Sequence, residues 1–214
     1  MLWIVDKPQG LTSFDVVRKF QRLYPKQKIW HGGTLDPMAS WLLLIWIWKE
    51  TKKLAKYQKW SKIYIANIDF SKQTDTWDLD YWEQFEEWEV VDTPLGLKKD
   101  GKIIKAPSQI QIKNLLSSLK WEVELPLPPF SAKRVKGKRL YELARSWKQI
   151  NLTKKMLIYD IKLIEYTFPL LKIKVEVWWW TYIRSLAFVI GRHFGLGGTL
   201  TYLRRIQVGN IRLR

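Results

Sequence analysis

The chain has 214 residues, of which 47% are hydrophobic and 27% are charged, and its 37 lysines and arginines against 20 acids give a formal net charge of +17. A chain of this length forms one sizeable domain or two small ones, and its dispersed basic residues favour a polyanion as partner over an anionic membrane surface. The absence of cysteine excludes disulfides and cysteine-ligated metals, and two histidines argue against a histidine-rich metal site.

In chain order, the first half of the sequence predicts a strand at residues 2–5, a helix capped by Ser13 and ending near Pro25, a loop around Asp36, a buried strand at 42–47, a helix at 50–57 and a strand at 62–70. Residues 71–105 are polar with few periodic signals, except that Asp100-Gly101 is typical of a hairpin turn.

The second half predicts a helix at 107–119, an extended segment at 125–129, a helix at 138–146, strands at 157–166 and 170–177, a helix at 181–194 stopped by Gly195, and a final strand at 200–208. Helices and strands alternate without a strict βαβ rhythm and without an obvious linker. The pattern therefore predicts a single α+β domain.

No targeting or membrane segment is predicted. Asp6 interrupts an N-terminal stretch that has no long apolar core, which argues against a signal peptide. The most apolar run, residues 41–48, is too short to span a bilayer. We therefore expect a cytoplasmic protein without membrane partners, and a monomer.

The segment WHGGTLDP at residues 30–37 presents a single acid in a tight loop. Gly32 and Gly33 allow backbone angles that are closed to other residues, and Pro37 biases Asp36 towards an extended conformation. Such a loop holds one carboxylate where a large substrate reaches it, with His31 five positions upstream. When the segment is taken alone, an ordinary Asp-Pro turn is the favoured explanation.

Five segments in order resemble pseudouridine synthases of the TruB type, the tRNA pseudouridine(55) synthases. They are DKPQGLTS at 6–13; HGGTLDP at 31–37 with AS at 39–40 and KETK at 49–52; KIY at 62–64 with TDT at 74–76; PPFSA at 128–132 with GKRLY at 137–141; and TYIRSL at 181–186 with LRR at 203–205 and VG at 208–209. The resemblance runs nearly end to end. It implies a pseudouridine synthase fold, with a mixed, mostly antiparallel central sheet flanked by helices and an RNA-binding cleft.

The implied reaction detaches the base of the T-loop uridine of tRNA from C1′, rotates it and rejoins it through carbon, with no cofactor and no metal. By resemblance, Asp36 is the catalytic aspartate, acting as nucleophile or as base, and Arg184 pairs with it. Tyr64 stacks on the flipped base, and His31 enters the space that the flipped nucleotide leaves. Without the family, a core tyrosine, a surface arginine and a loop histidine are the ordinary explanations.

The resemblance also assigns residues around these. Tyr182 and Leu203 line the uridine pocket, where plain core packing is the alternative role. Lys7 and Pro8 support the Asp36 loop rather than contact RNA. A basic group is expected to contact phosphates, and it consists of Arg134, Lys136, Lys138 and Arg139. Binding to RNA is then expected to weaken with salt.

The chain departs from the family pattern in its tryptophans and in its length. Fourteen tryptophans outnumber eleven glycines, and several stand where the family usually has glycine: Trp3, Trp30, Trp41, Trp46 or Trp48, Trp77, Trp121, Trp147 and Trp180. We hypothesise that the native protein carries glycine at most of these positions, because some bacteria read the codon UGA as glycine and other codes read it as tryptophan. The alternative is a degenerate homologue with a blocked site, and either way indoles are expected around Asp36 and the start of the Arg184 helix.

The family often adds a small C-terminal RNA-binding domain, which we expect to be absent, so that residues 1–214 form a single catalytic domain. Two other functions remain open from the sequence. One is an RNA-binding or tRNA-folding protein without catalysis, and the other is a guide-RNA-dependent pseudouridine synthase. The missing C-terminal domain favours the stand-alone enzyme over the second.

Overall fold

The computed structural model describes residues 1–47, 59–79, 86–87, 89–90, 96–99, 102–131, 133–135, 138–140 and 152–212. The described helices are α1 (Ser13–Leu23), α3 (Gln109–Ser118) and α5 (Ile183–His193). The described strands are β1 (Leu2–Lys7), β2 (Ile29–His31), β3 (Ser40–Ile47), β4 (Lys62–Asp69), β5 (Lys72–Gln73), β6 (Glu86–Glu87), β7 (Glu89–Val90), β8 (Gly96–Lys99), β9 (Lys102–Lys105), β10 (Trp121–Pro126), β11 (Arg134–Val135), β12 (Lys138–Arg139), β13 (Thr153–Thr167), β14 (Leu170–Val177), β15 (Thr199–Val208) and β16 (Ile211–Arg212).

A nine-stranded sheet organises the molecule, with its main path in the order β1-β3-β15-β4-β14-β13-β10. Two more strands extend it, because β2 pairs with β3 and β16 pairs with β15. Among the described strand pairs, β3 with β15 is parallel and the others are antiparallel. The expected α+β class, with a mixed and mostly antiparallel sheet, is confirmed.

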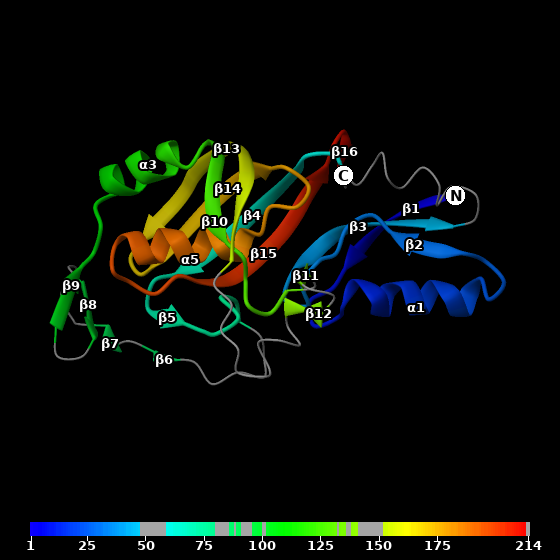
Figure 1. Ribbon diagram of the computed structural model, residues 1–214, viewed down its shortest axis with the longest axis horizontal. Coiled ribbons are helices and arrows are strands. Elements are labelled where there is room, and N and C mark those ends of the chain that lie inside the picture. Colours follow the sequence, from blue (N-terminus) through cyan, green and yellow to red (C-terminus); the bar gives the residue numbers. More distant parts are fainter. Residues whose placement is uncertain are drawn as a thin grey trace.

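The helices lie over different parts of this sheet. Figure 1 shows α1 beside β1, β2 and β3 at one end of the molecule, and α3 and α5 over the half that contains β13, β14 and β4. The short strands β5 to β9 lie along the lower edge of that second half (Figure 1). The long strand β15 joins the two halves, since it pairs with β3 on one side and with β4 on the other.

The burial of the strands follows the residue pattern. In β14 every second side chain is buried, as expected for a strand with one face on the core. In β3 both faces are covered, and its buried residues fall into two clusters on opposite sides of the strand. A continuous apolar run such as residues 42–47 is the sequence signature of a strand buried on both faces.

The helix ends are set by local chemistry. The side chain of Thr12 accepts a hydrogen bond from the Asp15 amide and the Asp15 carboxylate accepts one from the Thr12 amide, so Thr12 is the N-cap of α1. The expectation that Ser13 caps this helix is wrong, because its hydroxyl is instead bonded to the backbone of Leu35. Gly195, with a φ of +71°, follows the end of α5 as expected.

Most predicted elements are confirmed within a few residues, and two are not. The predicted helix at 138–146 is wrong at its start, because residues 138 and 139 form β12 and pair with β11; residues 141–146 lie outside the described residues. The predicted helix at 50–57 lies outside them as well. The strands on either side of the expected hairpin turn are paired, since β8 and β9 place Lys99 opposite Lys102, and residues 100–101 themselves lie outside the described residues.

Candidate active site

The loop that carries Asp36 connects β2 to β3. Gly33 has a φ of +124°, which favours glycine. Gly32 is required by close packing instead, because a Cβ there would lie 2.3 Å from the Trp46 ring. The Leu35 amide donates to the Ser13 hydroxyl at 2.8 Å, which ties the loop to the start of α1. The loop therefore leaves the Asp36 side chain 32% exposed on an otherwise fixed backbone.

A buried lysine, Lys7, supports this loop through hydrogen bonds to backbone carbonyl oxygens. The Lys7 ammonium donates to the carbonyl oxygens of Pro8 at 2.9 Å, Leu11 at 2.6 Å and Pro37 at 3.3 Å. Burial lowers the pKa of Lys7 to about 8, although the nearby Asp36 carboxylate opposes this shift. These bonds agree with the supporting role expected for Lys7.

A second buried cation, which the sequence argument missed as a functional residue, holds the other side of the loop. Arg205 donates from Nε to the Leu42 carbonyl at 2.9 Å and from a terminal nitrogen to the Gly33 carbonyl at 3.3 Å. Lys62 lies beside it, and burial together with the Arg205 charge lowers the pKa of Lys62 to about 7. The only earlier signal for Arg205 was its place in the LRR segment.

Arg184 extends from the first turn of α5 to the Asp36 carboxylate. Its Nε lies 3.2 Å from Asp36 Oδ2, and a terminal nitrogen donates to Oδ1 at 3.3 Å. The same guanidinium donates to the Thr76 carbonyl at 3.0 Å and to the Phe130 carbonyl at 3.1 Å. Its side chain is only 6% exposed. Three segments far apart in sequence therefore fix a planar donor group against one carboxylate.

A second carboxylate, that of Asp78, also contacts Arg184, and it was not predicted from the sequence. Asp78 Oδ2 lies 3.4 Å from Arg184 Nε, and the Asp78 side chain is only 6% exposed. The hydroxyls of Thr74 and Thr76 donate to the Asp78 carbonyl at 2.9 and 3.0 Å. The available signal was the TDTWD segment, of which only the first three residues were used. Asp36 and Asp78 therefore both approach Nε of the same guanidinium, and Asp78 helps to position Arg184.

All six predicted site residues line one cavity of about 440 Å³. They are His31, Asp36, Tyr64, Tyr182, Arg184 and Leu203. They come from β2, the loop after it, β4, the start of α5 and β15, so the parallel pairing of β3 with β15 is what brings the loop to the central strands. Lys62 and Arg205 line the same cavity.

Three rings among the predicted site residues, those of His31, Tyr64 and Tyr182, are buried or half-buried. Tyr64 is 7% exposed and lies opposite Arg205 in the pairing of β4 with β15. Burial raises the pKa of the Tyr64 and Tyr182 hydroxyls. Burial and the Arg205 charge lower the pKa of His31, which favours its neutral form. The cavity thus offers flat, uncharged rings beside a single acid.

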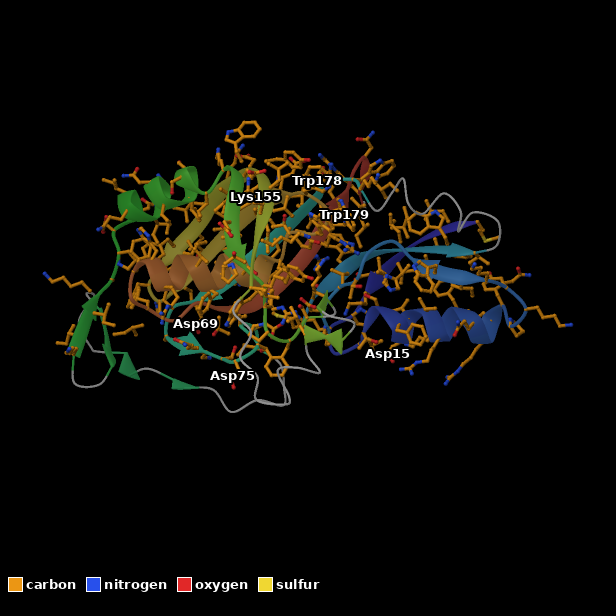
Figure 2. All side chains as sticks on the ribbon, in the orientation of Figure 1. Asp15, Asp69, Asp75, Lys155, Trp178 and Trp179 are labelled. Atoms are coloured by element: carbon orange, nitrogen blue, oxygen red, sulfur yellow. The ribbon has the colours of Figure 1, made fainter. Side chains whose placement is uncertain are left out.

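Indoles crowd the same cavity. Trp30, Trp179 and Trp180 are among its lining residues, as expected for the surroundings of Asp36 and of the Arg184 helix. Trp179 stacks on Trp180 with ring centroids 4.6 Å apart, and the Lys154 ammonium lies 2.9 Å from the Trp180 ring centroid. Figure 2 labels Trp178 and Trp179, which follow directly after β14.

Three further expectations concern phosphate contacts, metal ligands and membrane-spanning helices. The side chains of the basic group Arg134, Lys136, Lys138 and Arg139 lie outside what the structure describes. Across the described residues, no three histidine, aspartate or glutamate side chains gather as metal ligands. No helix in the described ranges is long and apolar enough to cross a membrane.

The chain was compared with known proteins. The tRNA pseudouridine synthase B of Caldicellulosiruptor saccharolyticus is 41% identical over 96% of this chain, and that of Clostridium kluyveri is 37% identical over 98%. The chain spans about two thirds of the length of these curated relatives, 66% and 67% respectively.

Solved structures show the same fold. A crystal structure of a Cbf5-Nop10-Gar1 complex superposes with a TM-score of 0.71 at 22% identity, covering all of this chain and 50% of the matched one. An H/ACA RNP bound to a substrate RNA containing 2′-deoxyuridine gives 0.68 at 21% identity, covering all of this chain and 49% of that one. A family model described as TruB family pseudouridylate synthase, N-terminal domain, matches residues 21–183, and this chain therefore belongs to the TruB family.

Proposed function

We propose that this chain converts a uridine of tRNA to pseudouridine, and that its target is the T-loop uridine at position 55. Membership of the TruB family and relatives named tRNA pseudouridine synthase B support the reaction. We further propose that it acts in the cytoplasm, as a monomer bound to the T-arm, and that it forms a single catalytic domain without a protein or guide-RNA partner.

The reaction is an isomerisation, so every atom of the uridine is retained. The N1–C1′ bond breaks, the base rotates, a C5–C1′ bond forms, and the proton lost from C5 is balanced by one gained at N1. Asp36 is the group that meets the sugar, either as nucleophile at C1′ or as base. Arg184 orients this carboxylate through its contacts with both carboxylate oxygens. No step requires a redox or metal centre.

The observation that carries the proposal is the contact between Asp36 and Arg184 inside the cavity that also contains Tyr64. A uridine must leave its helical stack to reach such a cavity, at a cost of about a few kcal/mol. The buried Tyr64 ring replaces part of the lost stacking, and Leu203 and Tyr182 close the pocket around the base. His31, at the mouth of the loop, fills the space that the nucleotide vacates.

Two other functions compete with this proposal. A non-catalytic RNA-binding or tRNA-folding protein would keep the basic surface but would not need a carboxylate ion-paired in a cavity. The second is a guide-RNA-dependent synthase. The Cbf5-Nop10-Gar1 and H/ACA RNP structures are 22% and 21% identical to this chain, against 41% for the tRNA enzyme. The difference in identity favours the stand-alone enzyme.

The test is chemical mapping of pseudouridine in an unmodified tRNA transcript treated with the protein or with Asp36→Asn. We expect modification of the T-loop uridine by the first and none by the second, while both bind the transcript. Glu165→Gln, which makes the same carboxylate-to-amide change at an exposed position on β13, is the matched control and should modify normally. Equal modification by the Asp36→Asn protein would refute the catalytic assignment, and modification that requires an added guide RNA would support the guided alternative.

A further inference from the structure

Left-handed backbone angles fall on an unexpected residue type in this chain. Among the described residues other than glycine, a positive φ occurs at Trp41 (77°), Trp77 (64°) and Trp121 (72°). All three are tryptophan. When an L-amino acid adopts such angles it is usually asparagine or aspartate, and for a bulky side chain the conformation is an outlier that costs about 1–2 kcal/mol. The described residues include several asparagines and aspartates, and none of them has a positive φ.

Each of the three positions is a place where the chain geometry calls for glycine. Trp41 stands at the start of β3, where the chain leaves the Asp36 loop and pairs with both β1 and β15. A positive φ inside a strand marks a bend that glycine normally provides. The indole at this position is partly buried against the smaller hydrophobic cluster of β3, with the Arg204 guanidinium 3.3 Å from its ring centroid.

Of the other two positions, Trp77 closes a turn and Trp121 follows the helix α3. The Trp77 amide donates to the Thr74 carbonyl at 3.3 Å, so Trp77 is the last residue of a four-residue turn, where glycine is favoured. Trp121 comes two residues after Leu119, the C-cap of α3, and its side chain is 68% exposed. A left-handed residue just after a helix is most often glycine. The Trp77 ring stacks on Phe188 with centroids 4.1 Å apart, whereas the exposed Trp121 side chain fills no space in the core.

We propose that the native protein has glycine at positions 41, 77 and 121, and that the codon written as tryptophan there is read as glycine by the source organism. The backbone angles support this independently of any comparison between sequences. The reassignment would extend to other positions encoded by the same codon, including those at the cavity. Replacement of Trp179 and Trp180 by glycine would remove the stacked indoles from the cavity wall and expose backbone amides to the RNA.

The decisive experiment is peptide mass spectrometry of the protein from its native host, read together with its gene. We expect UGA at codons 41, 77 and 121, and peptides that lack the mass of three indole side chains. The codon UGG at these positions, or peptides that contain tryptophan there, would overturn the proposal. This readout does not depend on catalytic activity, so it is separate from the test of the proposed function.

Comparing the stability of glycine and alanine variants at two tryptophan positions tests whether the positive φ favours glycine. Trp121 and Trp3 are both partly exposed residues of sheet strands, but only Trp121 has a positive φ. Because alanine is strained at positive φ and glycine is not, we expect Trp121→Gly to unfold at a higher urea concentration than Trp121→Ala. At Trp3 we expect the reverse order, since glycine weakens an ordinary strand. An alanine variant as stable as the glycine variant at position 121 would contradict the inference.

The functional consequence rests on the proposed synthase activity. A chain with glycine at positions 41, 77, 121, 179 and 180 is expected to modify tRNA at least tenfold faster than the chain with tryptophan, and to lose this activity with Asp36→Asn. If neither chain modifies tRNA, the proposed function fails while the peptide masses still decide the glycine assignment. If the tryptophan chain is the faster one, the extension of the reassignment to the cavity is wrong.

Discussion

The two charged partners at the centre of the cavity are held in different ways. Asp36 is 32% exposed and stands on a short loop, whose backbone is fixed by Lys7 and Arg205. Arg184 is 6% exposed and stands on a helix, and its own guanidinium makes the fixing contacts, with Asp78 among them. The acid is thus held by its main chain and remains open at its side chain, whereas the arginine is held by its side chain.

This difference suits a site in which one group must meet a substrate and the other must not move. An exposed carboxylate retains room to approach a sugar, and a guanidinium enclosed by carbonyl oxygens gains little from reorienting. This arrangement concentrates buried positive charge in a small volume, because Lys62, Arg184 and Arg205 line the cavity and Lys7 is buried against the Asp36 loop. Four predictions separate the loop from the arginine.

The largest effect is expected from removal of the guanidinium. Arg184→Met leaves the buried Asp78 and the Asp36 carboxylate without their shared partner, and breaking a buried ion pair costs about 3–5 kcal/mol. Urea unfolding measures this loss, with Arg192→Met, an exposed residue of the same helix, as control. We expect Arg184→Lys to recover part of the stability but little activity, because an ammonium cannot contact both carboxylates and both carbonyls. Equal stability of the two methionine variants would show that the arginine is not held as described.

A pH effect of a few kcal/mol is expected from Lys62. Its pKa is about 7 in the folded protein and 10.5 in a model peptide, so the unfolded chain binds the proton more tightly. Unfolding therefore takes up a proton between about pH 7 and 10.5, and the stability contribution of this group rises with pH over that window and is lost below it. Lys62→Met should flatten this rise relative to Lys59→Met, an exposed control. Parallel stability–pH curves for the two variants would contradict the expectation.

A smaller loss is expected when the loop loses its lysine. Lys7→Met leaves three carbonyl oxygens without their donor and should cost about 2 kcal/mol of stability. Since Lys7 acts through the Asp36 loop, we expect kcat to fall while KM for tRNA changes little. Lys19→Met, an exposed change on α1, is the control. A change in KM alone would indicate that Lys7 contacts RNA instead.

The smallest effects distinguish two neighbouring hydroxyls. Thr12→Ala removes the cap of α1 and should cost about 1 kcal/mol without lowering kcat in the folded protein. Ser13→Ala should cost a similar amount, about 1 kcal/mol, but should also lower kcat, because the Ser13 hydroxyl bonds the Leu35 backbone next to Asp36. Thermal unfolding and tRNA modification rates measure the two effects. Equal kcat for both variants would show that the Ser13 hydroxyl does not position the Asp36 loop for catalysis.

The sequence predicted those features that depend on neighbouring residues, such as the bounds of a strand or the end of a helix. The strand predicted at residues 170–177 has the bounds of β14, and Gly195 predicted the end of α5. The short strand β2 and the pairing of residues 134–139 were not predicted, because two or three residues carry no periodic signal. Ser13 was assigned to the helix rather than to the loop, since a cap and a tertiary hydrogen bond use the same hydroxyl.

The sequence alone determined the chemistry that is available, which is one acid in a glycine-rich loop on a basic chain without cysteine. It also determined which six residues are candidates for the site. Only the tertiary structure decided that they share one cavity, that Asp78 and Arg205 complete it, and that three tryptophans occupy left-handed backbone positions. The physical reason is that ion pairs and backbone angles at such sites depend on segments as far apart as residues 36 and 184, and their distance is fixed by strand pairing rather than by neighbours along the chain.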